Sequence, residues 1–531
     1  MNKLHIYIGV AISLCLAACD MFNTFPEGDT KTSDQKSEAF SGNPSTSSAD
    51  INGIYAQMIA LYGGLGADIG NHNDFGLAAQ LIALESNGQD FIAPNIGYNW
   101  FSYDYDFKDR DYTSTDALQM WTVFYKIIFA ANNALQSLDP EVISGEALYN
   151  YGQARAARAF AYLNMAQIYQ FTYSDQTKSL PCVPIITEQT STEQQLANPR
   201  ASVDSVYSLI LSDLDAAITA LDGYARSDKG HINQAVAYGL RARVNLAMKN
   251  YAAAASDASQ CLTLSGATPY TLAEVSKPNF CSADANSVIW ANIITASNDI
   301  VLSSIVNWPS HLSTFYTDGY TGVGATRSIT KALYAQIPNG DVRKGWWLNA
   351  NGESALLNNS NYQSYKANFA AANAYTNVKF GVAGDNTTTL SAAADWLLMR
   401  AEEMLLIQAE GLAMSGNTAE GKAVLEQFVQ NYRYAGYTCK ANSPEDLQDE
   451  IWLQRRIELW GEGFAFFDLM RLQKPLVREK GEGAGYYPVA WQYSIPANAP
   501  ILLWMIPQSE IEANDGISES DNNPKAPSPT V

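Results

Sequence analysis

The chain has 531 residues, a net charge of −21 and an isoelectric point of about 4.6. Its composition is that of a globular protein, and its length alone suggests about two to four domains at ~150 residues each. Because nucleic acid and anionic membrane surfaces repel so acidic a protein, the charge argues against both as partners.

The N-terminus has the pattern of a bacterial lipoprotein signal. Lys3 precedes the apolar run Ile6–Leu16, which is too short to span a bilayer. The run ends in Leu-Ala-Ala-Cys, which resembles a lipobox with Cys19 as the lipidated residue. We therefore expect a signal peptide over 1–18 and a lipid-anchored, flexible tether over 19–50. No later segment has the length and apolarity of a spanning helix.

The rest of the chain is predicted to be mainly α-helical, with an N-terminal part over 51–265 and a C-terminal part over 266–531. Apolar residues recur at helical spacing in three stretches, which predicts amphipathic helices with one buried face. These stripes begin at Trp121, Ala157 and Val203. In Ser443-Pro444-Glu445-Asp446, Ser443 can cap a helix, Pro444 suits its first position and the two acids favour its positive end.

Some of these helices are expected to pair as tetratricopeptide-like hairpins. The clearest candidate is Ala235–Leu262, where small alanines let two antiparallel helices approach closely. A second candidate is Ala401–Tyr432, with a turn at Ser415-Gly416-Asn417, and the helices near Trp121 and Gly152 suggest a third. Asn95–Thr113 and Gly266–Thr389 fit no helix and are interpreted as irregular loop excursions, where binding sites concentrate.

Segments along nearly the whole mature chain, in a fixed order, resemble the SusD/RagB family of outer-membrane nutrient-binding lipoproteins. The most specific is Arg455–Arg471, with the sequence RRIELWGEGFAFFDLMR. The others, in chain order, are Gly88–Asp90, Trp121–Leu138, Gly152–Tyr169, Val183–Pro184, Arg200–Leu221, the repeat from Ala235, Arg400–Gly411, Ile506–Pro507 with Glu510, and Asn522–Pro524.

The resemblance implies a SusD-like fold of helix hairpins with loop excursions, and a non-catalytic function. Such proteins lie on the cell surface as a lid over a TonB-dependent, SusC-like porin and bind glycans, or in some members peptides. The repeat face would contact the transporter, while the excursion loops would hold the ligand. The resemblance does not give the substrate, because these loops differ most among members.

A glycan site needs exposed aromatic rings, which cover sugar faces, beside short polar groups that pair the hydroxyls. The segment from Asn99 to Tyr105 has this composition, and Asn71–Asp74 lies upstream. A second patch lies in the later excursion, where Asp318 stands among aromatics. The alternative is that these rings are core, as Trp346 and Trp347 are expected to be. The predicted ligand-binding residues are Asn73, Asp74, Trp100, Tyr103, Tyr105, Trp308, Tyr316 and Tyr320.

Signals for an enzyme, a cofactor or a metal site are missing from the sequence. There is no HExxH, GxSxG or P-loop pattern, and no EF-hand spacing, although bound calcium stays an open question. The acids and arginines of Arg455–Arg471 alternate at helical spacing, which favours structural ion pairs over a glycosidase dyad. Glu402 and Glu403 are adjacent and would point apart. A surface glycoside hydrolase and a peptide-binding or adaptor repeat protein remain the alternatives.

Four cysteines remain after the signal and the lipidation site. They allow three full pairings, between which the sequence cannot choose, and none has the spacing of a metal or redox motif. Because a large domain does not need disulfides, buried free thiols are equally expected. The four are Cys182, Cys261, Cys281 and Cys439.

Overall fold

The computed structural model describes Lys36, Phe40 and residues 43–61, 70–94, 97, 99–358, 374–382 and 391–530. The predicted signal peptide, Cys19 and most of the tether lie outside this part of the chain, as do Asn95 and Tyr98. The division into 51–265 and 266–531 stays a prediction.

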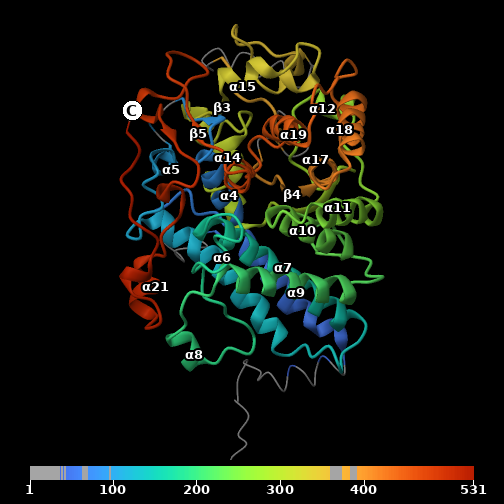
Figure 1. Ribbon diagram of the computed structural model, residues 1–531, viewed down its shortest axis with the longest axis vertical. Coiled ribbons are helices and arrows are strands. Elements are labelled where there is room, and N and C mark those ends of the chain that lie inside the picture. Colours follow the sequence, from blue (N-terminus) through green and yellow to red (C-terminus); the bar gives the residue numbers. More distant parts are fainter. Residues whose placement is uncertain are drawn as a thin grey trace, which may run out of the picture.

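Long helices that pack on their neighbours in series form the frame of the molecule (Figure 1). Each contacts the next in the order α3, α6, α7, α9, α10, α11, α17 and α18, and α19 packs on α17. Their bounds are α3 Ser48–Met58, α6 Thr115–Leu135, α7 Glu146–Tyr169, α9 Val203–Ala220, α10 Gln234–Ala247, α11 Tyr251–Ser265, α17 Ala401–Met414, α18 Thr418–Tyr432 and α19 Pro444–Glu458.

The three predicted hairpins are confirmed as α6–α7, α10–α11 and α17–α18. Small residues explain the close approach of the helices. Ala242, Ala254 and Ala258 are fully buried between α10 and α11. At Gly411 of α17, a Cβ atom would lie 2.5 Å from the backbone oxygen of Tyr251, so only glycine fits this contact with α11.

The predicted start of α19 is also confirmed. Ser443 caps the helix by accepting a hydrogen bond from the Asp446 backbone N–H at 3.0 Å, and Pro444 occupies the first turn. The cap and the buried face from Leu447 to Ile457 fix the direction in which α19 carries Glu458 into the core.

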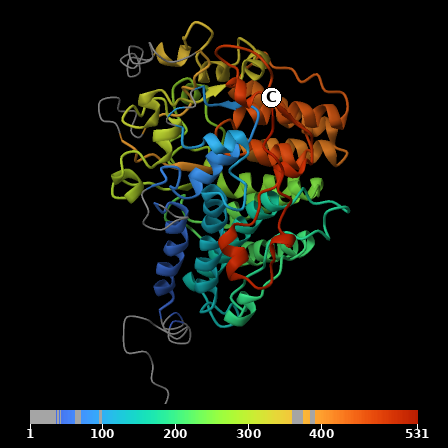
Figure 2. The same cartoon turned by 90° about the vertical axis from the view of Figure 1, so that its left-hand side faces the viewer.

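In their described residues the excursions contain short elements and no long helix. The expectation that they fit no helix is corrected, because the short helices α5 and α12 to α15 lie within them. In the view of Figure 2 the segment around 300–350 lies on one side of the molecule and the helices α17 to α19 on the other. The short helices are α4 Leu77–Ser86, α5 Ser102–Asp106, α8 Thr192–Leu196, α12 Leu272–Val275, α13 Asp299–Leu302, α14 Trp308–Leu312, α15 Lys331–Gln336, α20 Ala465–Arg471 and α21 Gln508–Ala513. Single 3-10 turns are η2 Pro44–Ser47, η3 Tyr320–Val323, η4 Val342–Trp346, η5 Ala355–Asn358, η8 Val489–Trp491, η9 Pro500–Leu502 and η10 Glu519–Asp521.

Among the described residues, three short antiparallel strand pairs occur, and two of them join segments that are far apart in the chain. One of them, β1 (Phe91–Ile92) with β3 (Ser328–Ile329), pairs Phe91 with Ile329 and Ile92 with Ser328. This pairing brings the chain just before Trp100 beside the chain just after Tyr320, and so joins the two excursions. The other pairs are β2 (Val288–Asn292) with β4 (Trp396–Arg400) and β5 (Leu476–Val477) with β6 (Ser494–Ile495).

Candidate ligand site

Rings from both predicted zones meet in one partly exposed group, which we call the aromatic cluster: His72, Trp100 and Tyr320. The rings of His72 and Trp100 stack, with centroids 4.7 Å apart and planes inclined by 24°. Nε1 of Trp100 donates to the Tyr320 hydroxyl at 2.7 Å, and that hydroxyl also hydrogen-bonds Nδ1 of His72. The structure thus connects two patches that are far apart in the sequence.

Two buried rings support the cluster from behind. The His311 ring lies between Tyr320, at 4.7 Å and 21°, and Phe75, at 5.4 Å and 14°. Nε2 of His311 donates to the backbone oxygen of His72 at 3.0 Å. Burial, with the nearby Arg327 guanidinium, lowers the pKa of His311 to about 3, so the imidazole is neutral at physiological pH. The His311 ring that supports the cluster is therefore uncharged, and each of its two faces packs against another aromatic ring.

Backbone and side-chain hydrogen bonds hold the loops that carry the cluster. Asn73 donates to the Asp116 carboxylate of α6 at 2.8 Å, next to His72. The Tyr320 backbone N–H donates to the Ser310 hydroxyl at 3.1 Å. Asn99, beside Trp100, accepts from the Arg327 guanidinium at 3.0 Å. These contacts keep the three rings in place without help from a ligand.

Tyr103 is the most exposed of the predicted residues. It lies on α5, one turn beyond Trp100, and 57% of its surface is accessible to solvent. Asp318 is exposed as well, two residues before Tyr320. Each of the two segments that carry Trp100 and Tyr320 therefore also carries an exposed side chain close to that ring in the sequence.

Five of the predicted ligand residues are buried, and the expectation that they line an exposed site is corrected. Trp308 packs against Trp396 and donates its indole N–H to the Ala394 oxygen, whereas Tyr316 donates to the Ser304 oxygen. The other three are Tyr105, which stacks on Trp491 at 4.6 Å, and the short side chains of Asn73 and Asp74.

Sequence reasoning missed the role of His311 and mentioned His72 only as part of a neighbouring segment. His72 and His311 are 239 residues apart in the chain, yet the fold brings them into contact. A signal was present: Asn307-Trp308-Pro309 is a helix start, and Asn307 caps α14 through the Ser310 N–H. A capped turn of this kind orients His311 inward.

The acids and arginines of the family-like motif form buried ion pairs, as predicted. Arg400 contacts both Glu458 and Glu462 at 2.8 Å, and Arg433 contacts Glu458 at 2.8 Å. Although burial alone would raise the pKa of Glu458, Arg433 and Arg400 hold it well below its usual range. We call the set the ion-pair network, whose members are Asp341, Arg343, Lys379, Arg400, Glu402, Arg433, Glu458 and Glu462.

Glu402 and Glu403 have separate partners, which confirms that they point apart. Glu402 joins the ion-pair network through Arg433, whereas Glu403 pairs with Arg243 at 2.6 Å. In the motif Arg455–Arg471, Glu458, Glu462 and Asp468 are buried as well, so none of its three carboxylates is exposed. Within the described part of the chain, no group of three or more His, Cys, Asp or Glu side chains has the arrangement of a metal site.

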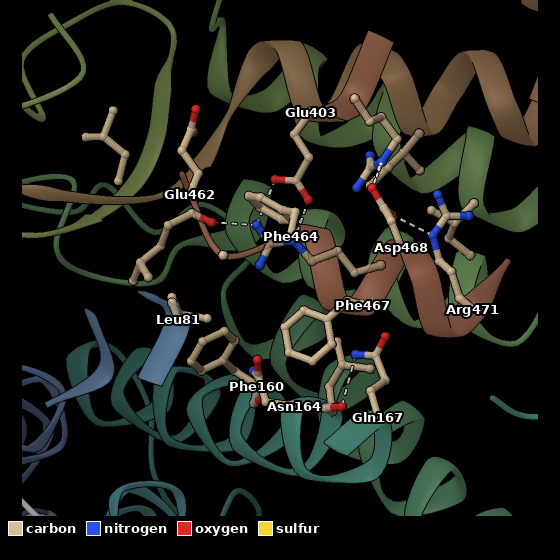
Figure 3. Close-up of a pocket in the computed structure, with 18 residues that line it drawn as sticks. Leu81, Phe160, Asn164, Gln167, Glu403, Glu462, Phe464, Phe467, Asp468 and Arg471 are labelled. Atoms are coloured by element: carbon tan, nitrogen blue, oxygen red, sulfur yellow. Dashed lines mark hydrogen bonds and ion pairs between the residues drawn. The ribbon is translucent and has the colours of Figure 1, made fainter. Parts of the chain in front are cut away.

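A narrow cavity of about 60 Å³ lies between α7, α10, α17 and α20 (Figure 3). Phe464 and Phe467 face Phe160 and Gln167 of α7 across it. The charged groups at its edge, Arg455 and Asp468 among them, pair with each other at 2.7 Å. The cavity is far below the ~300 Å³ typical of small-molecule sites, so a sugar ring does not fit it.

The four cysteines whose pairing was open are buried, and no disulfide joins any two of them. Burial raises the pKa of the Cys182 thiol to about 12. This thiol is therefore protonated and packs as a small apolar group. Among the described helices, none has the length and apolarity needed to cross a membrane.

Two family models match the chain in turn. Residues 39–246 match a family described as "Starch-binding associating with outer membrane", and residues 309–525 match the SusD family. A SusD-like protein P38 from Formosa agariphila is 23% identical over 407 residues, which cover 68% of this chain and 73% of that protein.

Solved structures have the same fold. A SusD-like carbohydrate-binding protein from Bacteroides vulgatus superposes with a TM-score of 0.72 at 23% identity, covering 91% of this chain and 98% of that one. A SusD superfamily protein from Bacteroides thetaiotaomicron gives a TM-score of 0.68 at 22% identity, with 91% and 99% covered. With both halves of the chain matched and the fold shared throughout, the chain belongs to the SusD/RagB family.

Proposed function

We propose that this protein is a surface lipoprotein that binds an oligosaccharide without cleaving it and delivers it to a SusC-like, TonB-dependent outer-membrane transporter. The observation that carries the proposal is the aromatic cluster, in which His72, Trp100 and Tyr320 are partly exposed and rigidly joined. Flat rings fixed in this way can cover the apolar face of a sugar at little entropic cost.

Polar groups near the cluster suit the hydroxyl rim of such a ligand. Asn71, next to His72 in the chain, is half-exposed, Asp318 is exposed two residues before Tyr320, and Tyr103 adds a further exposed ring. The names of the relatives, which include a carbohydrate-binding protein and a starch-binding family, support the same ligand class. A peptide ligand remains the alternative within the family.

The test measures by calorimetry how tightly the protein binds each member of a panel of polysaccharides. A thermal melt of the same protein shows whether it is folded. Trp100→Ala should weaken binding at least tenfold, or roughly 1.4 kcal/mol. It loses the stack on His72 and the bond to Tyr320, so the melting temperature should fall by a few degrees while the protein stays folded. Trp452→Ala is the matched control, because Trp452 is a half-exposed tryptophan on α19 that lies outside the aromatic cluster. A folded Trp100→Ala protein that binds as well as wild type would remove this cluster from the proposal.

The same panel separates binding from catalysis. We expect no new reducing ends after long incubation with a bound polysaccharide. Measured turnover that disappears when a carboxylate is replaced would favour a surface glycoside hydrolase instead. Binding of peptides but of no glycan would identify a peptide-binding member.

The lipid anchor and the transporter partner are both tested in the native membrane. Cys19→Ala should release a folded protein from the membrane fraction, since two or three acyl chains are what hold such an anchor. The wild-type protein should co-purify with a large β-barrel after mild detergent extraction. A protein that stays in the membrane without Cys19, or that always purifies alone after cross-linking, would contradict these two parts of the proposal.

A further inference from the structure

A second concave site lies away from the aromatic cluster and shares no residue with it. It is a cleft of about 990 Å³ between the start of α12, α15, the turns η4 and η5, and the loop that follows α18. Its volume is at the upper end of the range typical of ligand sites, ~300–1,000 Å³. A single monosaccharide would leave most of it empty, whereas a chain of several sugar rings matches it.

Two half-exposed tyrosines stand in the wall of this cleft, and both are held from behind. Tyr434 lies against two glycines: a Cβ on Gly340 would come within 2.5 Å of its ring, and one on Gly436 within 2.7 Å. The Tyr334 ring meets Tyr375 edge-on, at 5.1 Å and 71°. Such fixed, partly exposed rings have the geometry of sugar-stacking platforms.

The loop that carries Tyr434 is rigid because it continues the ion-pair network. Its neighbour Arg433 is buried and contacts Glu458, and the backbone oxygen of Arg433 accepts from the Val342 N–H at 3.1 Å. The two walls of the cleft, η4 and the loop after α18, are therefore joined at the base. A cleft built in this way is pre-formed and loses little entropy when a ligand binds.

Polar groups in the cleft are uncharged amides and a few separated charges. Asn349 accepts two backbone N–H bonds through Oδ1, at 2.8 and 3.0 Å, which fixes its amide plane and leaves its NH2 group as a donor. Asn339 and Glu353 are exposed. Lys344, at 5.1 Å from the Tyr334 ring, already donates to the Ile337 oxygen. This set suits neutral hydroxyls better than a phosphate or an apolar chain.

The buried wall also contains an unpaired donor. Trp347 lines the cleft, and its indole N–H is buried with no acceptor among the described residues. Because this N–H has no surface open to the cleft, it belongs to the inner side of the wall and is not counted as a ligand contact.

From these contacts we infer that the Tyr334–Tyr434 cleft is a second binding site for a neutral oligosaccharide, independent of the aromatic cluster. The inference rests on the proposed function, since it assigns the same ligand class to a second place. Two sites on one protein would let it hold a long polysaccharide at two points. Its apparent affinity would then exceed the affinity of either site alone.

Calorimetry with malto-, cello-, laminari- and xylohexaose tests the inference on the full chain. Wild type should bind two molecules of the preferred hexasaccharide. Ala435→Trp places a bulky ring in the cleft at an exposed position, removes no packing and should reduce the stoichiometry to one. Trp100→Ala should also leave one site, and the double variant none. Glu420→Trp, at an exposed position of α18, is the control for an added tryptophan.

The outcomes separate the two proposals. Binding of one molecule, abolished by Trp100→Ala and unchanged in a folded Ala435→Trp protein, overturns the second site and keeps the proposed function. Binding that Ala435→Trp abolishes and Trp100→Ala leaves intact supports the cleft and overturns the aromatic cluster. If none of the four hexasaccharides binds to wild type, the inference of a second site is wrong. Binding of a polysaccharide from the larger panel would still support the proposed function.

Discussion

The ion-pair network and the aromatic cluster use polar side chains in opposite ways. In the network, Arg400, Arg433 and Glu458 are buried and each has a charged partner within 3 Å. In the cluster, Trp100 and Tyr320 are half-exposed and joined by one hydrogen bond of 2.7 Å. The first arrangement stabilises the fold, and the second leaves ring surface uncovered. Charged motifs in this protein therefore belong to the scaffold, while ligand contacts are expected from uncharged rings.

The largest effect should come from breaking the network. Glu458→Gln removes the charge that Arg400 and Arg433 share, and loss of one partner from a buried ion pair costs on the order of 3–5 kcal/mol. We expect a clearly lower melting temperature and midpoint of chemical unfolding. Glu445→Gln, at an exposed position of the same helix, should cost less than about 1 kcal/mol. Equal melting curves for the two variants would show that the network does not stabilise the fold.

A pH dependence of stability should come from the buried support of the cluster. The folded pKa of His311 is about 3, below its ordinary 6.5, so the unfolded chain binds a proton between these values and the folded protein does not. The contribution of His311 to the free energy of unfolding is complete above pH 6.5 and decreases as the pH falls. At pH 4 it is smaller by about 3 kcal/mol.

The measurement is chemical unfolding of wild type and of His311→Asn from pH 7 to pH 4. Other groups titrate in this range, so the quantity of interest is the difference between the two proteins. His311→Asn should be the less stable at pH 7, because it loses the stack between Phe75 and Tyr320. The difference should shrink toward pH 4, and a constant difference would contradict a neutral, buried His311.

A smaller effect is expected from the hydroxyl that links the cluster. Tyr320→Phe removes the acceptor for Trp100 Nε1 and the partner of His72, at a cost of about 1 kcal/mol in stability. Binding should weaken severalfold, because the Trp100 ring is no longer fixed. Tyr149→Phe, half-buried in α7 and outside the cluster, should change neither property. If both variants bind ligand equally well, the orientation of Trp100 does not matter.

The smallest effect on stability should follow from Tyr103→Ala. With 57% of its surface exposed, this ring contributes little packing, and the change should stay within ~0.5 kcal/mol. Glycan affinity should nevertheless fall, since Tyr103 is an exposed ring on α5, three residues after Trp100. An unchanged affinity would confine the site to the three joined rings.

The helical frame could be predicted because its signals are local. Apolar spacing, small residues at Ala242 and Ala254, and the cap at Ser443 depend on neighbours a few residues away. The structural role of Glu458 was predictable for a similar reason, since its motif alternates charge within two helical turns. These features do not require knowledge of how the excursions fold.

The candidate site was only partly predictable because exposure depends on contacts between distant segments. Trp308 and Trp100 each follow an asparagine and stand among aromatic and short polar residues. Trp308 nevertheless packs on Trp396 and is buried, whereas Trp100 is half-exposed. The stack of His311 on Tyr320 requires α14 and η3 to fold over Phe75. No spacing in the sequence encodes such contacts.

The pairing of β1 with β3 has a consequence for when the protein becomes able to bind. Trp100 and Tyr320 are 220 residues apart, and the short ladder between Phe91 and Ile329 is what brings their loops together. A nascent or truncated chain that lacks the second half therefore has no aromatic cluster and should ignore its ligand. Ligand capture thus reports that the whole chain has folded, and a ligand bound between the two loops would in turn stabilise the folded chain against proteolysis.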